Sequence, residues 1–472
     1  MAVFSWRPVH SLVAVGMMLS VFACGAGRSQ SGGASAERSL VALSDDGGSV
    51  CELNESVVSR SGDYRTNVDL SASIALPGET GVDVVMTPQG AIAAVNAPSG
   101  ATLHWVDPAT GTIEQTVDVP AAIADIAFDG GTTLAVASGN QLLQLDTTSG
   151  EVLSQKRLPN ISRVAIAPDG YVAAIASKTV YLYDAEGSEV FSKLRNYRSV
   201  TDVEVLSCGG GRQFVYVTSF RNATFTDIND RTNPVQISKL EALDFSGQVQ
   251  WSLFGDSTDT IKQNVADTRL YRTTLGRDGY LYILGESAGT ATIFRWRGQP
   301  MTEDEQFGRT RPFLTRIDEY SSLHNSGAAH LTYYARVHPT DGQLVTAQMS
   351  FPRLPNTKAN VMRVGDIAGN ANGTVYFGGA AGATIANRDE LTLNGVPVGD
   401  YEGRDRAWMS VAPDFETRNF WTVLADEGGE GIVQGVDAGY GYSAALSNAE
   451  SGSVPVTTGD STGKVFLSFT AD

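Results

Sequence analysis

The stretch Val164-Ala165-Ile166-Ala167-Pro168-Asp169-Gly170 joins a short apolar run to a tight turn. Pro-Asp-Gly is turn chemistry, because proline presets one backbone angle and glycine accepts a positive φ. The same arrangement recurs along the chain, at Val84–Gly90, Ile126–Gly130 and Val203–Gly209. These closing glycines are about 40 residues apart, and less regular copies closing at Gly279, Gly373 and Gly441 bring the total to seven.

A second turn, running from Asp to Gly, follows each regular copy. It occurs at Asp107 to Gly111, Asp146 to Gly150, Asp184 to Gly187 and Asp244 to Gly247. Each unit therefore contains four short strands, which predicts an all-β, seven-bladed propeller of four-stranded antiparallel blades. The alternative is a β-sandwich whose spacing is coincidental. The last repeat ends at Phe469 with three strands, so we expect a strand near Leu70–Ala75 to complete it and close the ring.

The Asp-to-Gly and Pro-Asp-Gly turns resemble those of bacterial seven-bladed propellers, of the quinoprotein-like and bacterial β-propeller-repeat types. The resemblance covers residues 70–472. Its motifs are structural and are shared among unrelated functions, so it implies a fold and no active site.

Composition excludes several classes of protein. The chain has 472 residues, 50 glycines, 42% apolar residues and a formal charge of −18. The apolar content is sufficient for a core and excludes wholesale disorder. With only 7 lysines and no basic tract, a nucleic-acid partner is not expected.

The N-terminus predicts export. Arg7 and His10 precede a short apolar run, which is typical of a signal peptide over residues 1–23 and too short for a membrane span. Val21-Phe22-Ala23-Cys24 resembles a bacterial lipobox, although Phe22 is larger than usual. We expect Cys24 to be lipidated, residues 24–47 to form a flexible tether and residues 48–472 to form a single domain. The alternative is ordinary cleavage with loss of Cys24. Gly25 lacks the Asp that signals inner-membrane retention, which favours the outer membrane or cell surface.

The two remaining cysteines, Cys51 and Cys208, are able to pair in an oxidising compartment. A bond between them would hold the N-terminal segment against the fourth repeat. The alternative is two unpaired, small, buried side chains.

Three insertions are expected on one face, because the loop between strands two and three lies opposite the two tight turns of a blade. They follow Thr218 in blade four, lie between Leu284 and Leu331 in blade five, and lie between Phe377 and Ala407 in blade six. Long loops in a compact domain are usually functional or disordered, and we expect a functional surface.

The blade-five insertion and the strand after it are rich in polar and aromatic candidates. The ligand-binding candidates there are Arg309, Arg311, Tyr320, His324 and His330. A metal site is the alternative, but His330 and His338 would lie ~27 Å apart along a strand, which leaves only His324 with His330. An aromatic surface with arginines for a sugar, peptide or anion fits these residues better. Asp227-Ile228-Asn229-Asp230 offers calcium-type oxygens without the glycine and distal Glu of an EF-hand, so we predict no cofactor, with calcium or another divalent metal as the exception.

A second set of candidates begins the innermost strands, shortly before the turn glycines. They are Asp83, Asp125, Arg163, Asp202, Arg272, Asp366 and Gln434. We expect them to ring the channel mouth on the face that carries the insertions. They would either orient a ligand or hold a cation there, or only satisfy backbone groups at the start of each blade.

Together these features predict an exported, lipid-anchored binding or scaffold module. Its partner would be a protein, peptide or carbohydrate of the cell envelope or exterior, and the lipid anchor would be its only membrane contact. The chain has no recognisable catalytic motif. The alternative is a propeller enzyme, either a metal-dependent hydrolase or lactonase or a quinone-dependent dehydrogenase, using Asp83, Asp202 and Asp366 as metal ligands or bases.

Overall fold

The computed structural model describes part of the chain. The described residues are 48–208, 212–226, 230–254, 266–288, 329–401, 403–425, 430–450, 456–458 and 463–472. They fall within one compact unit, Ala42–Asp472. Among them, no helix is long and apolar enough to span a bilayer. Cys24, the predicted signal peptide and tether, and Arg309, Arg311, Tyr320 and His324 lie outside the described residues.

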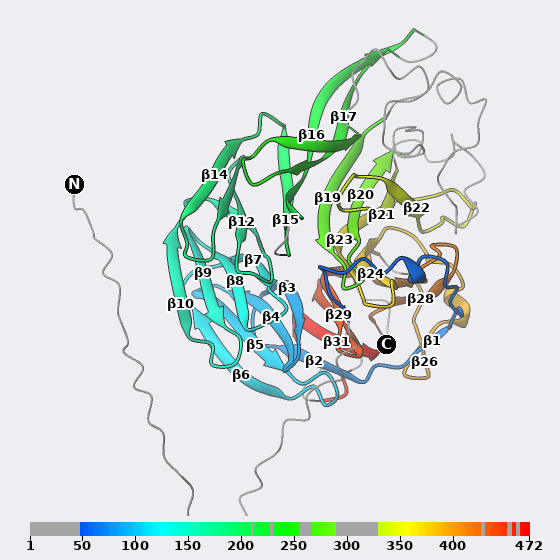
Figure 1. Cartoon of the computed structure of the whole chain (residues 1–472). Coiled ribbons are helices and arrows are strands. Elements are labelled where there is room, and N and C mark those ends of the chain that lie inside the picture. Colours follow the sequence, from blue (N-terminus) through cyan, green and yellow to red (C-terminus); the bar gives the residue numbers. More distant parts are fainter. Residues whose placement is uncertain are drawn as a thin grey trace, which may run out of the picture. The chain divides into compact units, whose positions relative to one another are not determined.

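The described residues form seven four-stranded antiparallel sheets, arranged as the blades of a β-propeller (Figure 1). Blades 1 to 3 consist of β3 (Thr80–Thr87), β4 (Gly90–Ala97), β5 (Gly100–Val106) and β6 (Ile113–Val119); β7 (Ile123–Phe128), β8 (Thr133–Ser138), β9 (Gln141–Asp146) and β10 (Val152–Arg157); and β11 (Ile161–Ile166), β12 (Val172–Ala176), β13 (Thr179–Tyr183) and β14 (Glu189–Leu194).

Blades 4 to 6 show the same strand order, and the two middle strands of blade 4 are the longest described. They consist of β15 (Ser199–Ser207), β16 (Gln213–Thr226), β17 (Thr232–Leu243) and β18 (Val249–Phe254); β19 (Thr268–Leu275), β20 (Leu281–Ala288), β21 (His330–Val337) and β22 (Leu344–Ser350); and β23 (Met362–Gly369), β24 (Val375–Ala381), β27 (Asp405–Val411) and β28 (Arg418–Val423).

Blade 7 joins the two ends of the domain. It consists of β29 (Gly431–Gly439), β30 (Tyr442–Ala449), β31 (Val465–Ala471) and, as its outer strand, β2 (Ala72–Leu76). β2 pairs antiparallel with β31, from Ala72 opposite Phe469 to Leu76 opposite Val465. The predicted fold class and the closure of the last blade by an early strand are therefore confirmed.

The Asp-to-Gly turns form because the aspartate carboxylate accepts hydrogen bonds from backbone N–H groups of its own turn. In blade 2, Asp146 Oδ1 accepts from the N–H groups of Thr148 (3.0 Å) and Ser149 (2.7 Å). Gly150 then adopts a left-handed φ of 72°, which a side chain would disfavour. In blade 5, His338 takes the aspartate position, and Gly342 N–H donates to its carbonyl at 3.0 Å.

The core lies between neighbouring blades. Small buried residues such as Ala93 and Ala135 lie on the second strand of a blade. Larger buried side chains such as Leu103 and Leu145 lie on the third strand, farther from the channel. Burying apolar side chains on both faces of every sheet explains why strands such as β4 are almost continuously apolar rather than alternating.

The chain before the first blade follows the face that carries the turns, called here the turn face. Asn54 N–H donates to the Asp278 carbonyl in the blade-5 turn, and Arg65 N–H donates to the Asn419 carbonyl on β28. Between these points lies η1 (Glu55–Val57). A disulfide joins Cys51 to Cys208, in the loop that follows β15. The segment is therefore held to three blades.

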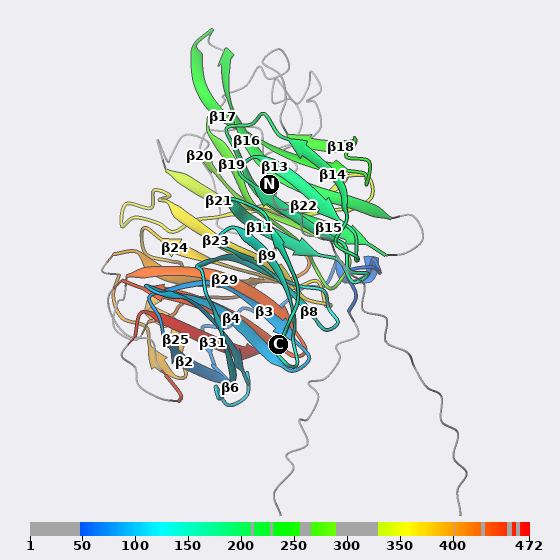
Figure 2. The ribbon, with the colours of Figure 1, turned by 90° about the vertical axis from the view of Figure 1, so that its left-hand side faces the viewer.

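Two of the three expected insertions lie within the described residues. In blade 4, β16 and β17 continue their pairing as far as Thr226 opposite Thr232, so the insertion is a β-hairpin arm rather than an irregular loop. Figure 2 shows this arm extending beyond the blade. In blade 6, the insertion contains η3 (Arg388–Glu390), β25 (Thr392–Leu393) and β26 (Val396–Pro397). The third insertion, residues 289–328, lies outside the described residues.

The blade-6 insertion is fixed by long-range contacts. β25 pairs in parallel with β1 (Asn67–Val68), and Leu70 N–H donates to Asn394 Oδ1 at 2.7 Å. Arg388 forms a buried ion pair with Asp405 at the start of β27. This insertion is thus an ordered part of the propeller.

Candidate functional site

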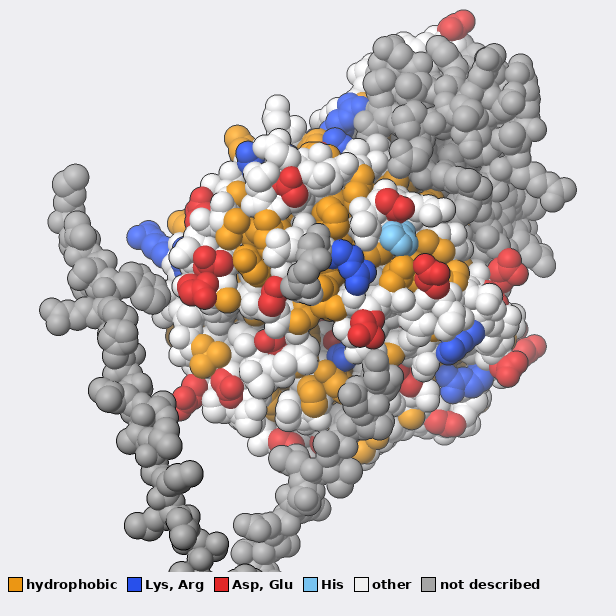
Figure 3. Space-filling view, in the orientation of Figure 1, with side chains coloured by type: hydrophobic (Ala, Val, Ile, Leu, Met, Phe, Trp, Pro, Cys, Tyr) orange, Lys and Arg blue, Asp and Glu red, His pale blue; other side chains and the backbone are white. Residues whose placement is uncertain are grey.

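A cavity of about 670 Å³ occupies the centre of the propeller, between the innermost strands. One end is bounded by the ring of charged residues predicted from the sequence. The other end reaches the turn face, where Gly48, Ser49 and Val50 line it. In the view of Figure 3, acidic side chains are dispersed over the surface rather than gathered in one patch. A cluster of charged side chains lies inside the channel.

A bulge places each ring residue on its inner strand. The pairing register shifts at the start of every innermost strand, for example between Gly81 and Asp83 and between Val200 and Asp202. A bulge inserts one extra residue and turns the following side chain. The repeat of this irregularity in all seven blades explains why charged side chains recur at one level of the channel.

The seventh ring position is a glycine, which corrects the prediction of Gln434. In blade 7 the register shifts between Val433 and Gly435, so Gln434 is the extra residue of the bulge and Gly435 takes the ring position. A Cβ atom on Gly435 would lie 2.9 Å from both Cα and Oδ1 of Asp83. Blade 7 therefore contributes no side chain to the ring, and its inner strand approaches Asp83 closely.

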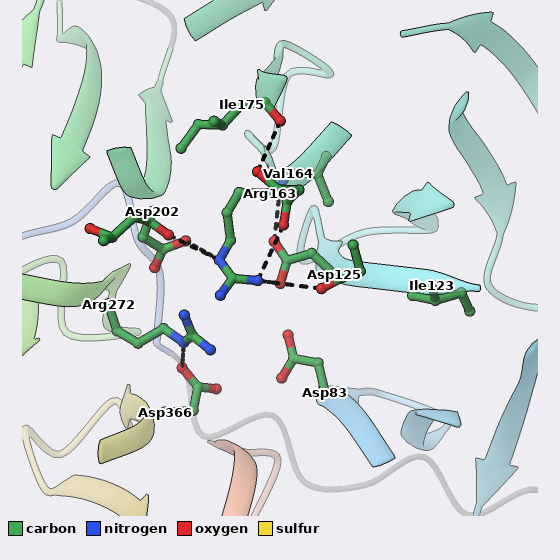
Figure 4. A network of polar contacts seen from close by, with 12 residues as sticks. Asp83, Ile123, Asp125, Arg163, Val164, Ile175, Asp202, Arg272 and Asp366 are labelled. Carbon is green, nitrogen blue, oxygen red and sulfur yellow. Dashed lines mark hydrogen bonds and ion pairs between the residues drawn. The ribbon is translucent and has the colours of Figure 1, made fainter. Parts of the chain in front are cut away.

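The ring residues contact one another around the channel (Figure 4). Arg163 lies between two carboxylates, with its Nη1 3.6 Å from Asp125 Oδ1 and its Nε 3.5 Å from Asp202 Oδ1. Arg272 Nε lies 3.4 Å from Asp366 Oδ1. From blade 2 to blade 6, acidic and basic side chains therefore alternate.

Three of the four ring aspartates also join neighbouring blades. Asp125 Oδ2 accepts from Val164 N–H at 2.8 Å, Asp202 Oδ2 from Thr273 N–H at 2.9 Å and Asp366 Oδ2 from Val436 N–H at 3.2 Å. Each of these bonds links a blade to the next one. The structural role considered for the ring, satisfying backbone groups at the start of a blade, is thus present for these three residues.

Burial shifts the protonation of the ring. It raises the pKa of Asp125 to about 6 against the opposing charge of Arg163, and that of Asp366 to about 6 against Arg272. Burial, followed by the charges of Asp366 and Asp125, raises the pKa of Asp83 well above its ordinary value. The low-dielectric channel thus favours either proton uptake or an added cation at these carboxyls.

A second layer of acids, which the sequence analysis missed, lies two residues farther along the inner strands. Glu204 accepts backbone hydrogen bonds from Val205 (2.7 Å) and Leu275 (3.1 Å), and burial raises its pKa to about 8. Asp437 accepts from Met86 N–H at 2.6 Å in blade 1. In the sequence, this second layer is marked by an acidic residue two positions after the ring position, which occurs only in blades 4 and 7.

Arg277 lies near the turn-face end of the same cavity. It comes from blade 5 and donates from Nε to the Ala438 carbonyl and from Nη2 to the Met86 carbonyl, each at 3.1 Å. Its guanidinium also lies over the Tyr440 ring, 4.1 Å from the centroid. This arginine therefore ties blades 7 and 1 to blade 5.

His330 is the only blade-5 candidate that falls within the described residues. Its Nδ1 lies 2.9 Å from Glu286 Oε1, which also contacts Arg269 Nη1 (2.5 Å) and accepts from the Tyr271 hydroxyl (2.7 Å). Although burial opposes the shift, the hydrogen bonds from His330 and Tyr271 lower the pKa of Glu286. His330 thus belongs to a compact polar cluster at the start of β21.

The described residues contain no group of three or more His, Cys, Asp or Glu side chains arranged to hold a metal ion. Of the carboxylates named for an enzyme, Asp202 and Asp366 are each paired with an arginine. The arrangement is best suited to binding a small polar or charged group at the channel mouth.

Comparison with known proteins supports the fold only. No family model and no curated protein sequence matches the chain. Among solved structures, the chain is similar to hydrazine synthase of Kuenenia stuttgartiensis (11% identity, 79% of this chain and 94% of that chain, TM-score 0.46). It is also similar to the β-propeller domain of Cps50 (Swd1) from Myceliophteria thermophila (10%, 85% and 99%, 0.48) and to the WD40 β-propeller domain of Doa1 (12%, 86% and 98%, 0.46). At these identities the likeness concerns the β-propeller fold alone.

Proposed function

We propose that this chain is an exported, lipid-anchored binding module, and that its partner meets the face that carries the insertions of blades 4 to 6. Export and the anchor rest on the signal-like N-terminus and on Cys24. The partner is a protein, peptide or carbohydrate of the cell envelope or exterior. A β-propeller is a scaffold typical of binding modules, and its variable loops supply specificity.

One observation carries the proposal: the chain joins the propeller on the face opposite the insertions. Residues 48–50 line the channel at the turn face, and the disulfide from Cys51 to Cys208 holds them there. An anchor attached through this segment is therefore connected to the propeller at the turn face. The insertion face, with the mouth of the charged ring, is then left accessible to a partner.

The hairpin arm offers a specific contact surface. Beyond Phe220 on β16 and before Lys239 on β17, no further described strand pairs with the outer edges of the arm. On the β17 edge, the N–H groups of Gln236 and Ser238 donate to the side chains of Asp267 (2.8 Å) and Thr268 (3.1 Å). A groove of about 370 Å³ runs along it, lined by Asn222, Ala223, Thr224, Pro234, Val235, Gln236 and Asp267. A strand edge that no other strand pairs with is a template for an added strand, which suits an extended peptide segment of a partner.

Metabolic labelling with a fatty-acid analogue tests the anchor. The wild-type chain is expected to take up label and to fractionate with membranes, whereas Cys24→Ser takes up none. Cys208→Ala serves as the control, because it removes a different cysteine and leaves Cys24 in place. Equal labelling of wild type and Cys24→Ser would show that Cys24 is not the lipid site.

Site-specific photo-cross-linking in intact cells tests the binding face. A cross-linker replaces Thr224 on the arm or, as a matched control, Glu186 in a turn of blade 3; both residues are exposed. We expect a discrete adduct from position 224 and none from position 186. The same adduct from both positions, or an adduct from position 186 only, would contradict the assignment of the face.

A further inference from the structure

The alternation of charge around the ring breaks at one place. From blade 2 to blade 6 the order is Asp125, Arg163, Asp202, Arg272 and Asp366, with an arginine between each pair of carboxylates. Blade 7 contributes Gly435 and blade 1 contributes Asp83. Three carboxylates, Asp366, Asp83 and Asp125, therefore follow one another without a cation between them.

This break leaves Asp83 facing more negative than positive charge: the charges of Asp366 and Asp125 raise its pKa, and the opposing charge of Arg272 acts less strongly. Within the described residues Asp83 forms no ion pair, and its one hydrogen bond is from the N–H of the adjacent Val84, at 2.8 Å to Oδ1. Figure 4 shows its carboxylate pointing into the channel, in the gap between Asp125 and Asp366. A cation at this point would restore the alternation.

The chain cannot easily supply that cation from blade 7. A Cβ on Gly435 would already lie 2.9 Å from Asp83 Cα and 3.0 Å from the Val84 nitrogen, so a lysine or arginine there would collide with backbone. The glycine instead lets the blade-7 strand approach Asp83 closely and adds no side chain beside it. The counter-charge is therefore expected from a ligand.

The wall of the cavity indicates the kind of cation. Below the ring, the second layer is mostly small and apolar, with Val85, Ala127, Ala165 and Ala368, and it is interrupted by the carboxyl groups of Glu204 and Asp437. Two residues along a strand span about 7 Å. The channel thus presents acidic groups at two levels, and the second level also carries the apolar side chains. Arg277 opposes the charge of Asp437 from the turn-face end.

We propose that the channel binds a short aliphatic diamine, with one ammonium group at Asp83 between Asp125 and Asp366 and the other at the level of Glu204 and Asp437. An ammonium group donates up to three hydrogen bonds, so it is able to contact several carboxylates at once. The alkyl chain is then able to contact the small apolar side chains of the second layer. A bare metal ion fits less well, because the described residues provide no metal-holding group of three or more side chains.

This inference rests on the proposed function only in taking the ring as the mouth through which a ligand enters. The ligand class is specified here by charge and spacing rather than by the partner that contacts the arm. A diamine of four or five carbons separates its nitrogens by approximately the distance between the two levels. A shorter diamine or a monoamine contacts one acidic level at most, and an uncharged diol pairs with neither.

Isothermal titration calorimetry on the purified full chain tests the inference with 1,4-diaminobutane at pH 7.5. The comparison ligands are 1-butylamine, uncharged 1,4-butanediol and calcium chloride. We expect saturable binding of one diamine per chain, weaker binding of the monoamine and none of the diol. Asp83→Asn should weaken diamine binding about tenfold or more, because it removes one charge-assisted contact.

Two further variants make the result specific. Asp83→Lys places an ammonium group of the chain in the gap and should abolish diamine binding. Asp118→Asn, on the exposed outer strand of the same blade, should change the affinity by less than about twofold. Circular dichroism checks that each variant is folded. Lowering the pH from 7.5 to 5 should weaken binding, because protons then compete for the same carboxyl groups.

Absence of diamine binding to the folded wild-type chain, equal affinity in Asp83→Asn, or binding of calcium instead of the diamine would each overturn the inference. These outcomes are separable from failure of the proposed function. If the chain binds no amine but cross-links through position 224, only the proposed ligand class is wrong. If it binds the diamine through Asp83 but forms no adduct at position 224, only the proposed binding face is wrong.

Discussion

Removal of the disulfide provides a quantitative test of how the N-terminal segment is held. Cys51 and Cys208 are 157 residues apart in sequence, so their bond closes a long loop in the unfolded chain. In the chain-entropy treatment, closing a loop of this size lowers the conformational entropy of the unfolded chain, which stabilises the fold by about 5 kcal/mol at 25 °C. The double variant Cys51→Ala/Cys208→Ala regains that freedom when it unfolds, and is destabilised by up to this amount.

The effect on thermal stability follows from the size of the domain. Unfolding entropy is about 2.1 cal/mol/K per residue, which for roughly 420 residues gives about 0.9 kcal/mol/K. A loss of about 5 kcal/mol therefore lowers Tm by about 5–6 °C. The folded segment is expected to stay in place, because Arg212 Nη2 still donates to the Cys51 carbonyl at 2.5 Å and Asn54 N–H still donates to the Asp278 carbonyl.

Differential scanning calorimetry of wild type and variant, each with and without reductant, measures the shift. Reductant should lower the Tm of wild type by the same amount and leave the variant unchanged. A variant whose Tm lies within about 1 °C of wild type would refute the reasoning, because the closed loop would then contribute nothing. A fall of much more than 5 °C would show that the bond also holds folded-state contacts.

Three other substitutions test the ring and the buried polar contacts. Asp83→Asn should raise Tm by about 1–3 °C at pH 7.5 and by less at pH 5: the folded-state pKa of Asp83 is raised, so its charged form costs stability at high pH, and this cost disappears as the group protonates. Calorimetry at both pH values measures it, and an unchanged difference between them would contradict the pKa argument. Gly435→Ala should lose about 1–3 kcal/mol in denaturant unfolding, because its Cβ meets Asp83 and the Val84 backbone; no loss would mean that the two strands separate freely. Arg336→Met should lose about 3–5 kcal/mol in the same assay, since fully buried Arg336 lies 3.9 Å from Asp278 and donates to the Pro413 and Gly373 carbonyls; a stable variant would show that Asp278 is neutral in the fold.

Much of the fold could be predicted from the sequence, because propeller blades are built from local signals. The turns at Asp146 to Gly150 and Asp244 to Gly247 are specified by residues within five positions of one another. The period of the closing glycines then gives the number of blades. The blade-4 insertion was located correctly, but its form was not: the eight paired positions after Thr218 make it a hairpin arm, which depends on pairing between its two halves.

The candidate site was predicted in part. The positions of Asp83, Asp125, Arg163, Asp202, Arg272 and Asp366 follow from their place in the repeat, and the structure brings them to one level of the channel. Gln434 was assigned wrongly, because a bulge of one residue is not visible in a sequence and shifts which side chain faces the axis. Glu204 and Asp437 were missed because they belong to only two blades and so form no repeat.

The sequence by itself determined the features that depend on neighbouring residues: the strands, their turns, seven repeats and the position of the insertions. Only the tertiary structure decided which charges meet, since Arg163 lies between Asp125 and Asp202 through contacts across three separate blades. It also decided that Asp83 has a glycine rather than a side chain as its blade-7 neighbour, because Gly435 and Asp83 are 352 residues apart and meet only when the ring closes. Local hydrogen bonding specifies a blade, whereas the electrostatics of the channel arise from the arrangement of all seven.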